Sequence, residues 1–243
     1  MIYCKFPQNS SGVWTRCRMG LGAVIRVATR VVAEIFLTLG LLVVAFVVYL
    51  LIWSDVQSAH AQSRLRATFE AQVEQAHRVH AVGPGVTTVV APAPDTGSAV
   101  GVMTIPRLGD DWSWVMVEGV ADADLAKGPG HFPGTAMPGQ PGNFAVAGHR
   151  ATHGEPFAHL DGLRRGDEVV VETTTDTYTY VVDRSEIVSP DLVSVLDPVP
   201  GQPDARPKRA LLTLVTCNPR WGSSERLIVT GHLRGRAILA EED

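Results

Sequence analysis

A single cysteine is the side chain best suited to act as a nucleophile in the C-terminal part of this chain. The sequence contains three cysteines, and only Cys217 follows a long apolar run that ends at Trp53. If this run crosses a membrane, Cys4 and Cys17 lie on the reducing side and Cys217 lies outside, without a disulfide partner in its own chain. Cys217 is then an inert core residue, a cross-link to another chain, or a nucleophile.

The sequence predicts two strands that bring an arginine beside this cysteine. The run ALLTLVTC, from Ala210 to Cys217, is almost continuously apolar, which is typical of a strand buried on both faces. After the loop NPRWGSSE, the run RLIVTGHL begins at Arg226 and alternates in the manner of a strand. An antiparallel pair places the end of the first strand beside the start of the second, so we expect Cys217 and Arg226 to converge.

A thiol nucleophile also needs a group that handles protons. An unperturbed thiol has a pKa of about 8.5 and is only slightly ionised at neutral pH, so it needs a neighbouring cation or base. All eight histidines follow the apolar run. His149 is our candidate, because it follows the predicted strand NFAVAG and stands at a strand end, as Cys217 does.

A metal site is the alternative use of the histidines in this region. His149 and His153 are four residues apart, a spacing that holds a metal when both lie on one helix face. The segment has no helix signal and Gly154 follows, so we expect no metal there. The sequence also contains no calcium-loop, nucleotide or other cofactor motif, and we predict no cofactor.

The elements that must position these residues are short strands. The stretches rich in Val, Ile, Leu, Thr and aromatic residues are residues 101–106, 113–117, 143–147, 168–172, 178–182, 210–216 and 227–233. Helical turns are predicted at residues 122–127, 156–163 and 191–196. No alternation of strands with longer helices is present, so we predict an all-β barrel or sandwich.

The apolar run from Ile35 to Trp53 has nineteen residues and no charge. At about 1.5 Å per residue, such a helix spans roughly the 30 Å of a bilayer core. Five basic residues precede the run and Asp55 follows it, which predicts a cytoplasmic N-terminus. The alternative is a signal peptide cleaved after Ala59-His60-Ala61, although the run is longer than a usual signal core.

These features predict four regions. Residues 1–34 form a cytoplasmic segment that starts at Met1 or Met19, and residues 35–53 form the transmembrane helix. Residues 54–98 form a stalk with a Pro/Gly-rich linker, and residues 99–243 form a folded domain outside the cell.

The composition excludes two other classes of protein. A hydrophobic share of 45% and a charged share of 19% exclude wholesale disorder. Residues 54–243 carry sixteen basic and twenty-four acidic side chains, a net charge of −8. This acidic balance argues against nucleic acid as the chief partner.

The motifs resemble those of the sortases, cysteine transpeptidases of Gram-positive cell surfaces. TLVTC with an arginine nine residues later, and AGHR before PFAHLDGLRRGD, carry the resemblance over roughly residues 100–233. KGPGHFPGTAMPGQPGN and TCNP resemble class E sortases in particular. The resemblance implies an eight-stranded β-barrel with short helices and an uncleaved membrane anchor, with His149, Cys217 and Arg226 as catalytic residues.

The resemblance also implies a reaction and its partners. The Cys217 thiolate attacks a Thr-Gly bond in an LAXTG- or LPXTG-like C-terminal sorting signal and forms a thioester. His149 protonates the leaving amine, and Arg226 donates hydrogen bonds to the oxyanion. The implied partners are surface proteins that bear the signal and an amine of the peptidoglycan precursor. Class E resemblance favours the LAXTG form.

Three further residues are candidate substrate contacts. Thr216 precedes the cysteine and either lines the groove or simply fills a strand position. His131, in GPGHFPG, has either a structural or a groove-lining role, and Trp221 lies in the loop after Cys217. The segment from Ser185 to Lys208 corresponds to the family's signal-recognition loop, or is an ordinary surface insertion.

Two other functions stay open at this point. One is a pilin-polymerising sortase, against which the lack of a second membrane helix after Leu233 argues. The other is a non-catalytic, membrane-anchored β domain that binds partners at the cell surface.

Overall fold

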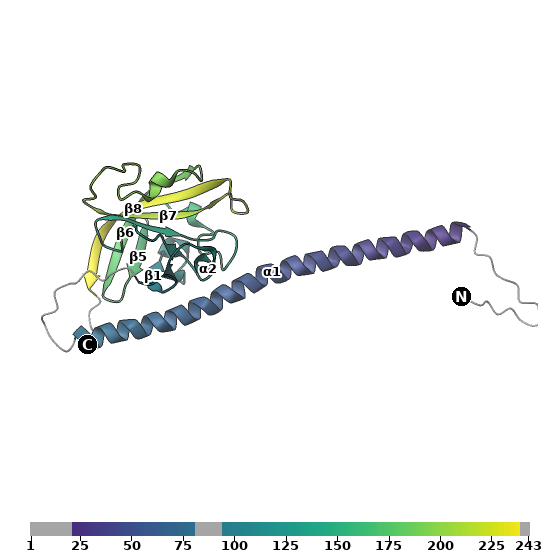
Figure 1. The fold of residues 1–243 in the computed structure, drawn as a ribbon, viewed down its shortest axis with the longest axis horizontal. Helices are drawn as coiled ribbons and strands as arrows, with labels where there is room; N and C mark the ends of the chain where they lie inside the picture. The colour runs from purple at the N-terminus through teal and green to yellow at the C-terminus, as the bar shows by residue number, and fades with distance from the viewer. Residues whose placement is uncertain (1–20, 81–93, 239–243) are drawn as a thin grey trace, which may run out of the picture. The chain divides into compact units, whose positions relative to one another are not determined.

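The structure is a computed structural model that describes residues 21–80 and 94–238. The chain divides into two compact units, Met1–Leu50 and Leu51–Asp243. A long helix, α1 (Leu21–His80), contributes to both units, and the second unit contains all the strands (Figure 1).

The first unit consists, among the described residues, of the N-terminal part of α1. Large apolar side chains from Val24 to Leu50 are exposed along it. The helix contains a stretch with a mean hydropathy of 3.0, and it is long and apolar enough to cross a membrane. The predicted span at residues 35–53 lies within this helix. Residues 1–20 of the predicted cytoplasmic segment lie outside the described residues.

Eight strands in the second unit close into a barrel, which confirms the predicted fold class (Figure 1). Around the barrel they follow the order β1-β2-β3-β4-β7-β8-β6-β5. The strands are β1 (Ala99–Thr104), β2 (Ser113–Glu118), β3 (Gly130–His131), β4 (Gly142–Ala147), β5 (Glu168–Glu172), β6 (Asp176–Val188), β7 (Ala210–Asn218) and β8 (Glu225–Ile238).

The sequence predicted every strand of this barrel except β3. That strand has two residues, Gly130 and His131, too few for an alternating pattern. The predicted helical turns contain α2 (Asp122–Leu125), η2 (Leu160–Gly162) and η3 (Val193–Leu196), and a further turn, η1 (Pro106–Leu108), was not predicted. Strands β6 and β8 are longer than predicted and pair with each other along most of their length.

The pairing of the central strands determines where the strand ends meet. β4 pairs with β7 in parallel, and β7 pairs with β8 in antiparallel orientation. The C-terminal ends of β4 and β7 therefore lie beside the N-terminal end of β8. The barrel interior is filled by a cluster that includes Phe144 and Val146 of β4 and Leu212 and Leu214 of β7. Because side chains alternate along a strand, Cys217 lies on the outer face of β7.

The C-terminal part of α1 packs against the barrel within the second unit. Phe69 is 3% exposed and lies in a small apolar cluster with Val102 of β1 and Val115 of β2. The side-chain amide of Gln62 bonds to both the N–H and the C=O of Val115, at 2.9 Å each. The predicted stalk is thus helical as far as His80 and in contact with the domain, whereas most of the predicted linker lies outside the described residues.

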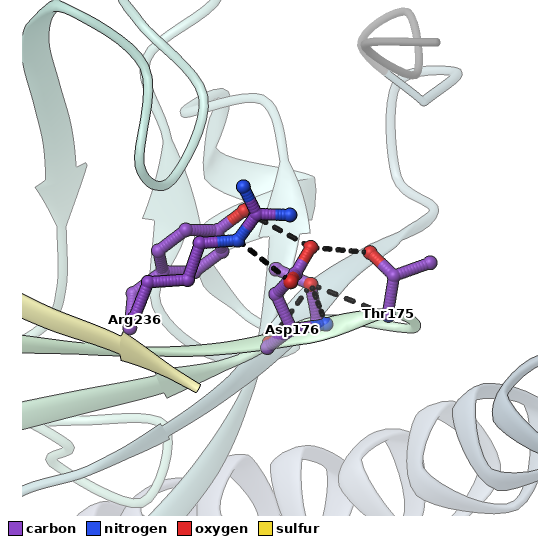
Figure 2. Close-up of polar contacts among 5 residues, drawn as sticks. Thr175, Asp176 and Arg236 are labelled. Carbon is purple, nitrogen blue, oxygen red and sulfur yellow. Dashed lines mark hydrogen bonds and ion pairs between the residues drawn. The ribbon is translucent and has the colours of Figure 1, made fainter. Parts of the chain in front are cut away.

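A polar cluster joins the barrel strands at the end far from Cys217. Figure 2 shows the carboxylate of Asp176, at the start of β6, accepting hydrogen bonds from Arg236 Nε at 2.7 Å and Thr175 Oγ1 at 2.8 Å. The hydroxyl of Tyr178 donates to the same carboxylate at 3.3 Å. Burial opposes ionisation of Asp176, but these donors outweigh it and lower the carboxyl pKa.

Candidate active site

The antiparallel ladder between β7 and β8 brings Cys217 and Arg226 side by side. The two residues are direct Cα partners in the ladder. Directly opposed residues in an antiparallel pair point to the same face of the sheet, so both side chains lie on the outer face of the barrel. Cys217 is a free cysteine and is half-buried. The predicted convergence of these two residues is confirmed.

The parallel ladder between β4 and β7 brings His149 to the same level from the other side. The last paired residues are Ala147 and Val215, and the N–H of Gly148 donates to the C=O of Val215 at 3.0 Å. His149 and Cys217 each lie two residues beyond this pair. The strand order β4-β7-β8 therefore places the backbone of Cys217 between the chain end of β4 that leads to His149 and the start of β8 at Arg226.

The environment of His149 favours the neutral imidazole. Burial lowers its pKa from the usual 6.5, and the neighbouring His153 lowers it further, whereas Asp122 of α2 acts in the opposite direction. The rings of His149 and His153 stack with centroids 4.8 Å apart and an interplanar angle of 23°. A neutral imidazole at physiological pH can accept a proton from a thiol, as a catalytic base must.

The guanidinium of Arg226 is hydrogen-bonded to the backbone where the β7–β8 loop meets β8. Its Nη1 donates to the backbone carbonyls of Ser223 at 3.0 Å and Glu225 at 2.9 Å. These bonds fix the orientation of a permanently charged group on the residue whose Cα pairs with that of Cys217. A guanidinium so placed can donate to a carbonyl oxygen that gains negative charge.

Arg150 contacts the backbone of Cys217 and was not predicted from the sequence. It is 7% exposed, and its Nη1 donates to the carbonyl of Cys217 at 3.3 Å and to Asn218 Oδ1 at 2.6 Å. Its Nη2 forms an ion pair with Asp161 at 3.1 Å. One residue thus follows His149 directly in the chain and also binds the backbone of Cys217. Its position next to a strand-end histidine was the available signal.

The Sortase domain family model matches residues 103–234, more than half of the chain. The chain belongs to the sortase family. Members of this family are cysteine transpeptidases.

Two of the similar proteins are named as class E sortases. Sortase SrtE1 of Streptomyces coelicolor is 37% identical over 215 residues, which cover 85% of this chain and 57% of that protein. The chain thus spans little more than half the length of this relative. Sortase E of Streptomyces avermitilis, a solved structure, is 43% identical with a TM-score of 0.56, covering 62% of this chain and 97% of that one. SrtF of Corynebacterium diphtheriae is 31% identical with a TM-score of 0.60, covering 66% and 96%.

The three candidate substrate contacts lie in different environments in this sortase. Thr216 is 3% exposed, and its hydroxyl donates to the carbonyl of Gly148 at 2.7 Å. His131 is fully buried, with Nδ1 bonded to Glu118 at 2.7 Å and Nε2 bonded to Thr135 at 2.9 Å. These contacts favour the structural role for His131. Trp221 is 70% exposed in the β7–β8 loop.

The segment between β6 and β7 contacts the start of strand β4. The first residues of the predicted recognition loop, Ser185 to Val188, continue strand β6. Further along, the carbonyl of Val195 accepts a hydrogen bond from Asn143 of β4 at 2.9 Å. Leu192 and Val193 of this segment are exposed apolar residues. The hydrogen bond from Asn143 holds the segment against the start of β4, at the opposite end of that strand from His149.

The described part of the chain offers no alternative metal centre. Within residues 21–80 and 94–238, no group of three or more His, Cys, Asp or Glu side chains could hold a metal ion. His149 and His153 stack on each other rather than converging on a shared point.

Proposed function

We propose that this sortase is a membrane-anchored transpeptidase that cleaves a C-terminal sorting signal between Thr and Gly through a thioester on Cys217. The observation that supports the proposal is the register of β4, β7 and β8, in which Cys217 and Arg226 are Cα partners and His149 follows the strand paired with β7 on its other side. A structural core cysteine would need neither neighbour.

The reaction begins with proton transfer from the thiol. The lowered pKa of His149 makes its neutral form available to take the proton of Cys217. The thiolate then attacks the carbonyl carbon of the Thr-Gly bond, and Arg226 donates to the oxygen that becomes negative. As the tetrahedral intermediate collapses, imidazolium His149 protonates the leaving glycine amine. The products of this half-reaction are a thioester and the released C-terminal tail.

The second half-reaction returns the enzyme to its starting state. An incoming primary amine attacks the thioester carbonyl, and His149 accepts the proton that this amine loses. The Cys217 thiolate leaves and is reprotonated by His149, so protons balance over the cycle. We propose an amine of the peptidoglycan precursor as acceptor, which would attach the surface protein to the cell wall.

The sorting signal and the cellular location follow from the relatives and from the helix. Similarity to class E sortases supports an LAXTG-type signal over LPXTG. Helix α1 supports a single-pass anchor, and the basic residues before its apolar stretch support a cytoplasmic N-terminus and an external catalytic domain. We also propose that Trp221, exposed in the loop after Cys217, contacts the bound peptide.

The test is a transpeptidation assay with the full-length protein in detergent. The protein is incubated with a peptide containing LAXTG and with hydroxylamine as the amine, and products are identified by mass spectrometry. We expect cleavage after Thr, formation of the Thr hydroxamate, and complete loss of both with Cys217→Ala. Product that persists in Cys217→Ala would exclude the proposed nucleophile, and a wild-type protein that forms no adduct would favour the non-catalytic alternative.

A further inference from the structure

Two residues of α1 bind both polar groups of one peptide unit beside the active site. The hydroxyl of Ser58 donates to the carbonyl oxygen of His153 at 2.9 Å. The carboxylate of Asp55 accepts from the N–H of Gly154 at 2.9 Å. This C=O and this N–H belong to the same planar unit, so the helix fixes both the position and the tilt of the His153–Gly154 peptide.

The turn that contains this peptide needs such support. His153, Gly154 and Glu155 have φ angles of +56°, +75° and +50°. The left-handed region is unfavourable for residues with a side chain, and it persists only where surrounding contacts hold the backbone in it. A Cβ atom at Gly154 would lie 2.6 Å from Cη2 of Trp114, so the turn is also packed tightly against β2.

Both residues that flank Gly154 connect the turn to the catalytic strands. The ring of His153 stacks on the ring of His149. The carboxylate of Glu155 forms an ion pair with Arg220, three residues after Cys217 in the chain. The turn therefore contacts one catalytic residue directly and the loop that follows the other.

The helix is itself fixed firmly enough to act as a support. Ser58 is completely buried, so its hydroxyl depends on the His153 carbonyl as a partner. One turn further along, Gln62 binds the backbone of Val115 and the carbonyl of Lys127, the latter at 2.8 Å. Arg66 then donates to Ser113 at 3.0 Å. Successive turns of the helix are thus fastened to the barrel.

We propose that Ser58 and Asp55 are positioning residues for catalysis, because they hold the turn whose His153 ring packs against His149. The inference rests on the proposed role of His149. It makes the first turns of α1 after its apolar stretch a part of the catalytic unit, where the sequence predicted only a stalk.

Loosening the turn that contains His153 and Gly154 should change the pKa of His149. Burial and the nearby His153 hold the pKa of His149 down. A loosened turn exposes His149 and moves His153 away, so the His149 pKa rises toward its usual value. The other charged or titratable groups around the pair and its turn are Asp122 of α2, Asp55 of α1, Cys217 of β7, Arg226 of β8, and the paired groups Glu155–Arg220 and Arg150–Asp161.

The test uses full-length protein in detergent with Ser58→Ala, Asp55→Ala and Asp55→Asn. We expect kcat to fall about tenfold in Ser58→Ala and Asp55→Ala, with a smaller change in KM, because a loosened turn misplaces the base. Asp55→Asn keeps an acceptor oxygen and should retain most of the activity. The titration midpoint of His149, followed by NMR with carbon-labelled histidine and assigned with His149→Asn, should rise in both alanine variants.

Two controls separate positioning from a general loss of stability. Gln57→Ala changes an exposed neighbour on the same helix and should leave both readouts unchanged. Gln62→Ala weakens helix docking away from the turn and should lower the thermal midpoint without moving the His149 midpoint. The proposal is overturned if Ser58→Ala and Asp55→Ala titrate like the wild type, or if Gln62→Ala shifts His149 equally. Because the titration needs no turnover, it is independent of whether the proposed transpeptidation occurs.

Discussion

The hydroxyl of Thr216 donates a 2.7 Å hydrogen bond to the carbonyl of Gly148. This bond fastens the residue before Cys217 to the residue before His149, so the two catalytic strands are joined one position away from the reacting groups. We therefore propose that Thr216 affects catalysis through strand geometry, which is a more specific role than that of a residue suited to β structure.

Replacement of Thr216 by valine removes this bond and keeps the side-chain shape. We expect the free energy of unfolding to fall by about 1–2 kcal/mol, because a buried carbonyl loses its donor, and kcat to fall several-fold. Thr213→Val is the matched control, since Thr213 also bonds from β7 to β4, through Asn143 at 2.7 Å. It should lose similar stability in urea unfolding but keep its kcat. Equal kcat values in the two variants would contradict the special role of Thr216.

Arg150 should be required for a correctly placed nucleophile. Arg150→Met leaves the carbonyl of Cys217 and the side chain of Asn218 without their donor. We expect a loss of about 1–3 kcal/mol in stability and a larger than tenfold loss of kcat. Arg165→Met, at an exposed site, is the control and should behave like the wild type. A fully active Arg150→Met would show that the backbone of Cys217 holds its position without this contact.

The stacked histidines predict a pH effect on stability. Because the pKa of His149 is lowered in the folded state, the unfolded chain binds more protons near its usual value of 6.5, and stability decreases as pH falls through that range. His153→Asn removes one cause of the lowering. The variant should therefore lose less stability than the wild type between pH of about 7.5 and 5.5 in denaturant unfolding. A larger loss in the variant would reverse the assigned sign.

The cluster around Asp176 should affect stability without affecting chemistry. Asp176 pairs with Ile238 at one end of β8, whereas Arg226 lies near the other end. We expect Asp176→Asn to lower the free energy of unfolding by about 1–3 kcal/mol at neutral pH and to leave kcat unchanged. Because the folded-state pKa of Asp176 is lowered, the difference from wild type should begin to shrink below pH of about 3.8 and vanish only below the lower folded-state pKa. A changed kcat would indicate coupling along the whole barrel.

The sequence could predict the part of the site that is formed by residues close together in the chain. Strand ends at Cys217 and Arg226 follow from apolar patterning, and a short loop between two strands makes them antiparallel neighbours. The parallel contact between β4 and β7 has no local signal, because the strands it joins are separated by two other strands in the chain. His149 could therefore be chosen as a candidate from its residue type and its position after a strand. Which strand lies beside it in the barrel could not be predicted.

The polar contacts between α1 and the barrel were not predicted from the sequence, for a different reason. Ser58 and Gln62 are polar residues that face the barrel, where they bind backbone groups. The segment was predicted to be a stalk because it is polar and rich in Ala, Gln, Arg and Glu, and this composition does not indicate which side chains face the barrel. Arg150 was missed similarly, because its partners Asp161 and Asn218 are distant in sequence and become neighbours only in the folded chain.

The ladder between β7 and β8 fixes the spacing of Cys217 and Arg226 by backbone pairing rather than by the loop that joins them. Within that loop, the exposed residues Trp221 and Gly222 make none of the hydrogen bonds that orient Arg226, which go to Ser223 and Glu225. A library of replacements confined to these two positions would alter which peptides are admitted while every member retained the same nucleophile and oxyanion donor.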